Sequence, residues 1–409
     1  MLKQYCRLSD SQSDNFVGLK FINGEPIVIF PRGYRLSEDE KQVRKDIVRL
    51  LATLNRFSGR CEGEKTFNSI GEMNLSMPIQ SYQYIIYDFL AHGYYTEKEV
   101  DYHINNKGKV NWKRTIQKIT PQINNNNIVY LNFVTRKNKI KDNNIITKIH
   151  EYCVYESFTR FGWLFLSNDI LPKKPSIKLN KKAFLIILKE ALGNTFNDNK
   201  KMLFQSMINI ISYVDENTND KLNDSFGVNQ FEYIWENMID HIFGEENKEI
   251  YFPHANWHIL QDKGYKKESS PLEPDTIIKF NNKYYIIDAK YYKYGITRNP
   301  MHLPTTSSIE KQIVYGEYIQ QKFDIGDEKI YNAFILPFDS KGNNYPYEFV
   351  SVGTGNWNNH NRNYDFVLAI LLDTRYIINT YSKHNVSEIE RLTNLIEESL
   401  DNYLHNFEK

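Results

Sequence analysis

The sequence predicts an α/β protein, with a C-terminal domain whose β-sheet is flanked on both sides by helices and an N-terminal α+β region before it. Three observations lead to this class. Residues 226–409 alternate amphipathic helical patterns with short apolar strand patterns. Residues 1–165 open with a hairpin signal and continue into helices and a basic segment. Residues 166–225 hold prolines, helical patterns at 182–193 and 198–213, and a polar stretch, which indicates a helical connector ending in a flexible link.

The composition sets outer limits on function. The chain has 409 residues, of which 25% are charged and 41% hydrophobic, as expected for a soluble protein with more than one core. The net charge is only +1, so nucleic-acid binding would have to come from local patches. No apolar run approaches the roughly 20 residues of a membrane span. The three cysteines form no CxxC pair, and the first residues lack a signal-peptide pattern, so we expect a cytoplasmic protein without membrane association.

The first elements can be placed from short-range signals. Residues 16–30 predict a hairpin that turns at Asn23-Gly24, a pair that readily adopts positive φ. Residues 37–57 predict a helix, because serine and glutamate begin it with the spacing of a capping box.

Residues 79–150 predict a winged-helix-like module. We expect a helix near 80–91, a second from Thr96, a third around 111–119 and a strand at 128–134, the order of a winged helix-turn-helix. Basic residues with one tryptophan among them would suit phosphate contacts and groove docking. The candidate DNA-binding residues are Lys109, Trp112, Lys113, Arg114, Lys118, Arg136 and Lys137. The alternative for Trp112 is a place in the core of this module, with the basic residues on a solvated helix.

The C-terminal domain begins with an amphipathic helix at 231–242, which Gly244 ends. A second helix is expected from Ser307 to about residue 322. Strands are expected at 329–336 and 364–372 and a final helix at 386–404.

The stretch EPDTIIKFNNKYYIIDAKYY, residues 273–292, carries the chemistry. Branched and aromatic residues predict two strands joined by a tight turn at Asn281-Asn282. Counting outward from this turn pairs Thr276 with Ile287, Asp275 with Asp288, and Glu273 with Lys290.

Two facing carboxylates repel each other unless a positive charge lies between them. Mg²⁺ is the natural candidate, because it binds one or two carboxylates and keeps waters for use with a phosphate. Lys290 lies two residues from Asp288 and therefore points to the same side, within reach of a metal-bound water or a phosphate oxygen. Asp275, Asp288 and Lys290 together predict a metal-dependent phosphodiesterase.

Three neighbouring residues are further candidates. Glu273 is either a third metal ligand or a salt-bridge partner of Lys290. Glu232 either reaches the metal from the preceding helix or is a charge at the edge of that helix. Gln312 lies one turn inside the following helix, where it could align the lysine or a phosphate, so we count it with the catalytic residues.

Several stretches of the chain resemble one family. Pro274-Asp275 followed by Asp288-Ala289-Lys290 is similar to the signature of PD-(D/E)XK nucleases. The fuller pattern resembles the LlaJI-type restriction endonucleases, relatives of the McrC subunit. The similar stretches are FPRGY (30–34), GKVNWKRT (108–115), FEYIWENM (231–238), PLEPD (271–275), YYIIDAKYY (284–292) and SSIEKQIVYGEYI (307–319).

The resemblance implies a PD-(D/E)XK restriction-endonuclease-like fold over residues 226–409. It implies an endonuclease that cuts double-stranded DNA in a restriction-modification, anti-phage system. It also implies a McrB-like AAA+ NTPase partner, which fits the lack of a P-loop motif in this chain. By homologous role Asp275, Asp288 and the Ala289 carbonyl would hold Mg²⁺, or Mn²⁺ in its place, and Lys290 would orient the attacking water. The number of metal ions, one or two, and the oligomeric state, monomer or homodimer, are left open.

Two other functions compete with restriction. One is a non-catalytic DNA-binding or assembly subunit on a degenerate nuclease fold, against which the intact Asp275, Asp288 and Lys290 argue. The other is a repair or RNA-processing nuclease of the same fold.

Overall fold

The structure is a computed structural model that describes residues 2–9, 15–61, 73–124, 127–140, 144–166, 170–214, 224–259, 265–343, 345–356, 362–381 and 386–407. The chain forms two compact units, Met1–Leu75 with Leu222–Lys409 and Ser76–Lys221. Among the described helices, none is both long and apolar enough to cross a membrane.

A five-stranded sheet in the first unit joins segments that are far apart in the sequence. Its order is β1-β3-β2-β10-β4. The strands are β1 (Cys6–Leu8), β2 (Val17–Ile22), β3 (Glu25–Phe30), β4 (Met73–Asn74) and β10 (Asp224–Val228), with the short helix η1 (Leu2–Tyr5) before β1 and α1 (Glu40–Cys61) after β3. The predicted hairpin is confirmed, since Asn23 and Gly24 have φ of 53° and 83° between β2 and β3.

The pairing of β2 with β10 depends on two glycines. Gly18 lies opposite Gly227 in the antiparallel register. Gly18 has a φ of +144°, and a Cβ there would lie 2.2 Å from the carbonyl oxygen of Phe226. A Cβ on Gly227 would lie 2.3 Å from the Val17 oxygen. The two backbones therefore approach as closely as only glycine allows.

The second sheet of this unit is the predicted α/β sheet, and it is mixed. Its order is β13-β14-β15-β17-β16, with β14, β15 and β17 parallel and the two outer strands antiparallel to their neighbours. The strands are β13 (Thr276–Phe280), β14 (Lys283–Ala289), β15 (Ile330–Phe338), β16 (Phe349–Asn356) and β17 (Phe366–Asp373). Every residue of β15 and β17 is buried, as expected for central strands covered on both faces.

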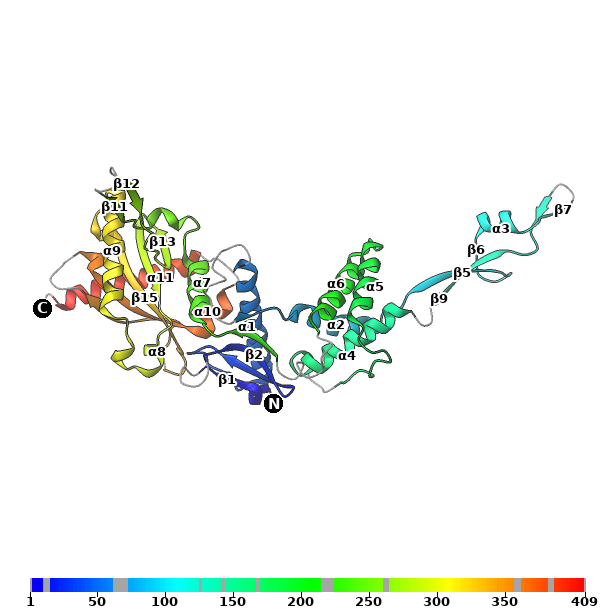
Figure 1. Ribbon diagram of the computed structural model, residues 1–409, viewed down its shortest axis with the longest axis horizontal. Coiled ribbons are helices and arrows are strands. Elements are labelled where there is room, and N and C mark those ends of the chain that lie inside the picture. Colours follow the sequence, from blue (N-terminus) through cyan, green and yellow to red (C-terminus); the bar gives the residue numbers. More distant parts are fainter. Residues whose placement is uncertain are drawn as a thin grey trace. The chain divides into compact units, whose positions relative to one another are not determined.

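Helices cover this sheet, as Figure 1 shows for α7, α9 and α11 around β13 and β15. The helices are α7 (Glu232–Phe243), α8 (Tyr294–Thr297), α9 (Thr306–Phe323), α10 (Thr374–Thr380) and α11 (Val386–Phe407), with the short turns η4 (Lys248–Tyr251), η5 (Pro300–His302), η6 (Asp327–Lys329) and η7 (Asn363–Asp365). On one face, Ile277 and Ile286 pack with Tyr315 and Ile319 of α9. A separate hairpin is made of β11 (Asn256–Ile259) and β12 (Tyr265–Glu268).

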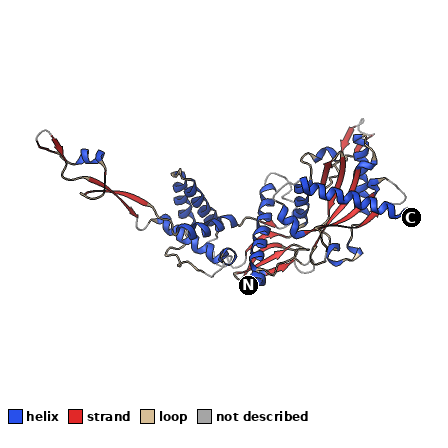
Figure 2. Ribbon diagram, turned by 180° about the vertical axis from the view of Figure 1, so that it is seen from behind, coloured by secondary structure: helices blue, strands red, loops and turns tan. Residues whose placement is uncertain are grey.

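The second unit contains packed helices and a small sheet, distinguished by colour in Figure 2. Its helices are α2 (Ile79–His92), α3 (Trp112–Lys118), α4 (Ile145–Phe165), α5 (Lys181–Gly193) and α6 (Asp198–Tyr213), of which α2, α4, α5 and α6 pack together. Its sheet has the order β5-β9-β6, with β5 (Lys98–Ile104), β6 (Lys109–Val110) and β9 (Val134–Ile140), and β7 (Gln122–Asn124) pairs with β8 (Asn127–Val129).

The element order expected for a winged helix differs from the structure. The helix from Thr96 is wrong, because residues 98–104 form β5 and pair along their whole length with β9. The strand expected at 128–134 is instead β9, which begins at Val134, after the short strand β8. Residues Val100, Tyr102 and Ile104 alternate with polar neighbours, which is a strand pattern.

The two units also divide the chain differently from the three regions expected from the sequence. The first 75 residues belong with the C-terminal domain, because β10 pairs with β2 and β4. The helices of residues 170–214 pack with α2 and α4 rather than forming a separate connector. Of the polar link expected at 215–225, residues 215–223 lie outside the described residues, and Asp224 and Ser225 begin β10. A fragment of residues 1–165 would therefore separate β2 from its partner β10.

The glycine pair gives a test of this division. We expect Gly18→Ala to destabilise the protein by about 2–3 kcal/mol or more, because the added Cβ clashes with backbone and the φ is unfavourable. Thermal unfolding should show a midpoint roughly 5–10 °C lower. Gly193→Ala is the control, since a Cβ at the end of α5 meets no atom within 4 Å. Equal midpoints for the two variants would contradict the close approach of β2 and β10.

Candidate active site

The predicted hairpin and its register are confirmed. Thr276 pairs with Ile287 and Phe280 with Lys283, so the turn falls on Asn281-Asn282. Both turn residues have positive φ, 49° and 61°, which asparagine tolerates better than most residues. This register brings Asp275 and Asp288 to the same end of the strand pair, on the sheet face that α9 covers.

Asp275 is fixed by contacts with its backbone and its carboxylate. Its Oδ2 accepts a hydrogen bond from the Ala289 backbone N–H at 2.8 Å. Lys248 Nζ donates to the Asp275 carbonyl oxygen at 2.5 Å and to Asp240 Oδ2 of α7 at 2.8 Å. Lys248 therefore joins the start of β13 to α7, and the Ala289 N–H holds the carboxylate.

Asp288 forms an ion pair with Lys290. The Lys290 ammonium lies 2.8 Å from Asp288, and the side chains are only 23% and 13% exposed. The backbone N–H of Lys290 donates to the Ile335 oxygen at 2.9 Å, which aligns the lysine with β15. The predicted pairing of Lys290 with Glu273 is wrong, because Lys290 is paired with Asp288 while Glu273 is exposed. The strand ends before Glu273 could lie opposite the lysine.

Three acids influence one another electrostatically at this site. Burial raises the pKa of Asp275 well above its usual range, and a hydrogen bond to Asp288 and the charges of Asp288 and Glu236 add to the rise. Burial also raises the pKa of Glu236 to about 7, although Lys290 opposes this. Burial alone would lower the pKa of Lys290, but Asp288 and Asp275 raise it above its ordinary value. Burial and neighbouring acids therefore disfavour the charged forms of Asp275 and Glu236 more than Lys290 favours them.

The sequence did not single out Glu236. It lies on α7, one turn after the predicted Glu232, and both side chains line a cleft of about 400 Å³ that also reaches Ala289 and Lys290. The i, i+4 spacing places both glutamates at the same edge of the apolar stripe, and this spacing was the available signal. The charge of Glu236 acts on Asp275, and the charge of Glu232 acts on Glu236.

The donor set fits a magnesium ion with few protein ligands. Within the described part of the chain, no three His, Cys, Asp or Glu side chains gather closely enough to enclose a metal together. Asp275 and Asp288 supply carboxylate oxygens, and the charge of Glu236 acts on Asp275 from α7. Mg²⁺ commonly uses one or two carboxylates and keeps several waters. The residues present fit such an ion, and Glu236 would add charge near it.

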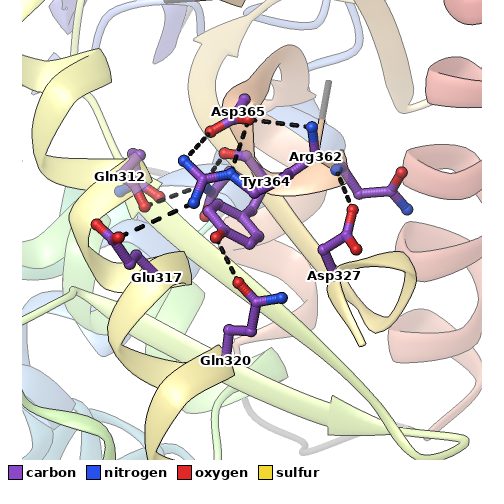
Figure 3. Close-up of polar contacts among 9 residues, drawn as sticks. Gln312, Glu317, Gln320, Asp327, Arg362, Tyr364 and Asp365 are labelled. Carbon is purple, nitrogen blue, oxygen red and sulfur yellow. Dashed lines mark hydrogen bonds and ion pairs between the residues drawn. The ribbon is translucent and has the colours of Figure 1, made fainter. Parts of the chain in front are cut away.

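Gln312 is buried between α9 and the centre of the sheet. Asn332 of β15 donates to the Gln312 backbone oxygen at 2.9 Å, and the side-chain amide has no hydrogen-bond partner among the described residues. Figure 3 shows Gln312 beside Tyr364 and Asp365, where Arg362 binds Asp365 at 3.0 Å. The predicted role of Gln312 in aligning the lysine or a phosphate stays a prediction.

Tyr315, one turn after Gln312, lies near the acids. It is 6% exposed and belongs to the hydrophobic core, as the sequence favoured. Burial raises its pKa to about 12, and the charges of Asp288 and Asp275 contribute to the rise. The Tyr315 side chain therefore lies close enough to the acids for their charges to affect it.

In the second unit, several candidate DNA-binding residues lie together. Arg136 of β9 lies opposite both Tyr102 of β5 and Lys109 of β6, so these side chains share one face of the sheet. The Arg114 guanidinium stacks on the Tyr102 ring at 3.9 Å. Lys109, Arg114 and Arg136 therefore form a cationic patch around Tyr102.

The remaining candidates are exposed but less clustered. Trp112 is 55% exposed, so it is not in a core. Its ring packs edge-on against the ring of Phe133, with 5.6 Å between the ring centres. Lys137 follows Arg136 on the strand and points to the opposite face. The candidate DNA-binding lysines outside the patch, all exposed, are Lys113, Lys118 and Lys137.

Comparison with known proteins finds a family model, a curated protein and a solved structure that this chain is similar to. Residues 16–375 match the family described as LlaJI restriction endonuclease. The chain is similar to the Type II restriction enzyme BsuMI component YdjA of Bacillus subtilis (strain 168), with 24% identity over 353 residues, 82% of this chain and 75% of that protein. It is also similar to a chain in a solved half-complex of Thermococcus gammatolerans McrB AAA+ hexamers with bound McrC, with a TM-score of 0.40, 15% identity, and coverage of 93% of this chain and 83% of that one.

The raised pKa of Glu236 predicts how stability depends on pH without metal. A carboxyl that titrates at about 7 when folded and near 4.5 otherwise makes the folded state bind more protons, so its ionisation destabilises the protein as pH rises through this window. Glu236→Gln should therefore be more stable than the wild type at pH 8 by roughly 1–2 kcal/mol, with little difference at pH 4.5. Melting curves in chelator at both pH values measure this.

The control is Glu246→Gln, which removes an exposed glutamate shortly after α7. It should leave the pH dependence unchanged. If the Glu236→Gln variant is less stable than the wild type at pH 8, ionised Glu236 does not destabilise the folded protein and the prediction is wrong.

Proposed function

The chain belongs to the LlaJI restriction endonuclease family, and from this we propose that it is a Mg²⁺-dependent endonuclease of the PD-(D/E)XK type. It would hydrolyse phosphodiester bonds of double-stranded DNA as part of a restriction-modification, anti-phage system. The observation that carries the proposal is the pair of adjacent acids, Asp275 and Asp288, with Lys290 at 2.8 Å from Asp288. A mixed sheet flanked by helices supports the fold assignment.

A degenerate site would have no reason to keep this arrangement. Burying one acid against another costs free energy, and the folded protein accepts this cost at Asp275. Residues held in such unfavourable surroundings concentrate where ligands bind. The arrangement therefore favours a catalytic subunit over a purely structural one.

Each residue has a distinct part in the proposed reaction. Asp275, Asp288 and the Ala289 carbonyl would hold Mg²⁺, or Mn²⁺ in its place. When bound, the ion lowers the pKa of water and stabilises charge on the phosphate. Lys290 would release part of its contact with Asp288 to donate a hydrogen bond to the attacking water or to a phosphate oxygen. Glu236 would keep the local charge negative enough to favour a divalent ion.

The second unit would dock DNA. The patch of Lys109, Arg114 and Arg136 supplies the cations that contact a phosphate backbone, and the exposed Trp112 offers an apolar surface near it. We propose this function for the β5-β9-β6 sheet with α3, in place of the winged helix-turn-helix expected from the sequence.

A McrB-like AAA+ NTPase is the proposed partner. The stretches named above resemble the LlaJI-type restriction endonucleases, relatives of the McrC subunit, and this sequence has no P-loop motif. In this proposal the partner supplies the NTP-driven movement on DNA.

The acid pair and the lysine give the direct test of catalysis. Asp288→Asn and Lys290→Ala should each lower Mg²⁺-dependent cleavage of plasmid DNA by roughly 10²–10³-fold or more. Mg²⁺ should raise the melting temperature of the wild type, because a ligand that binds only the folded state stabilises it. It should raise that of Asp288→Asn much less, since a metal ligand is lost.

Asp324→Asn is the matched control. Asp324 is an exposed acid at the end of α9 with a φ of 50°, a conformation that asparagine also adopts. This variant should cleave like the wild type. Full cleavage by Asp288→Asn would exclude the proposed site. An equal rise in melting temperature with Mg²⁺ for the wild type, Asp288→Asn and Asp324→Asn would also exclude it.

The DNA-docking proposal has its own test. Reversing two charges of the patch, Arg114→Glu with Arg136→Glu, should weaken duplex binding by the full chain and lower the slope of log K against log salt by about 2. The control pair, Lys182→Glu with Lys189→Glu, changes exposed lysines on α5 of the same unit. Equal losses for both pairs would show that only net charge matters and that the patch is not a docking site.

A further inference from the structure

The cleft beside the acids has a wall that comes from the N-terminal segment. Arg32, which follows β3, lines the cleft with Lys290 and Lys293 from the end of β14 and with Glu232 and Glu236 from α7. The acids lie on one helix, whereas the cations come from the β3 turn and the end of β14. A substrate with negative charge would contact the cationic part of the cleft.

The backbone around Arg32 is fixed without help from its side chain. The Arg32 N–H donates to the Tyr291 hydroxyl at 2.6 Å, and the Thr374 hydroxyl donates to the Arg32 carbonyl oxygen at 3.1 Å. Gly33 has a φ of +74°, and a Cβ there would lie 2.8 Å from Thr374 Oγ1 and 3.2 Å from the backbone of Phe338. These contacts hold the turn directly against the β13-β14-β15-β17-β16 sheet.

The guanidinium is held in a defined place. Arg32 Nη1 donates to the Tyr291 carbonyl oxygen at 3.3 Å, and the group lies 5.0 Å from the centre of the Tyr291 ring. Tyr291 itself packs against Phe231 at 5.3 Å and Trp235 at 6.1 Å, so the ring is a rigid support. An arginine that is already ordered loses little entropy when it binds a ligand.

This guanidinium has no anionic partner within the described part of the chain. One N–H contacts the Tyr291 carbonyl, and the other donors stay available. A partly buried arginine without a carboxylate, beside two lysines in a cleft, is suited to bidentate contact with phosphate oxygens.

We infer that Arg32 is a substrate-binding residue, which holds a phosphate of the DNA strand in the active-site cleft. The inference rests on the proposed nuclease function and extends it, because it makes the site composite. The metal-binding acids come from the C-terminal segment, whereas one phosphate contact comes from the FPRGY turn at 30–34. Arg32 would position the strand while Lys290 acts at the scissile phosphate.

The test uses the full chain with a duplex oligonucleotide, in Ca²⁺ for binding and in Mg²⁺ for cleavage. Arg32→Ala should weaken binding and raise KM about 10-fold, with a smaller effect on kcat, and lower the salt slope by about 1. Arg32→Lys should restore the salt slope but only part of the affinity, since lysine cannot make the bidentate contact. Melting temperatures should stay near that of the wild type.

Arg35→Ala is the matched control, because Arg35 is exposed and lies three residues later, away from the cleft lining. It should behave like the wild type. If Arg32→Ala has the same KM and salt slope as the wild type, the inference is overturned and the nuclease proposal stays intact. A wild-type protein that neither binds nor cleaves the duplex would overturn both. If Arg32→Ala does not fold, the inference is tested with Arg32→Lys instead. An affinity of Arg32→Lys for the duplex equal to that of the wild type also overturns the inference.

Discussion

The first unit is organised around one electrostatic constraint, the placement of two acids against each other at the end of β13 and β14. Burial and the neighbouring charges of Asp288 and Glu236 raise the pKa of Asp275, so this site costs the folded protein free energy. Several features serve to maintain it. The Asn281-Asn282 turn sets the register, Lys248 anchors the start of β13, and the Ala289 N–H holds the carboxylate. A site that departs from the best packing in this way is typical of a place where a ligand completes the structure.

The N-terminal residues are part of the same construction. The sheet of β1, β2 and β3 accepts β10 through the close approach of Gly18 and Gly227, and the turn after β3 is fixed to Tyr291 and Thr374. Both ends of the chain therefore form one unit, and residues 76–221 are inserted between them as another. This arrangement explains how a cleft can take cations from residue 32 and acids from residues beyond 230.

Local patterns predicted the hairpin, its register and α7, because turn chemistry and apolar spacing act over a few residues. They predicted Asp275, Asp288 and Lys290 for the same reason. The pairing of β10 with β2 could not be predicted, since it depends on contacts between residues about 200 apart. Glu236 and Glu232 have equivalent spacing on α7, and it takes the tertiary structure to show that the charge of Glu236 acts on Asp275. The strand β5 was available from the alternation of Val100, Tyr102 and Ile104, but the acidic Thr96-Glu97 start favoured a helix.

We propose that Asp275 and Asp288 bind a divalent cation that completes the site. This can be tested with crystals of the full chain grown with Mn²⁺ and measured at a wavelength where manganese scatters anomalously. We expect an anomalous peak in contact with the carboxylates of Asp275 and Asp288, and no such peak in crystals of Asp288→Asn. A peak elsewhere with none between these acids, or the same peak in the variant, would contradict it.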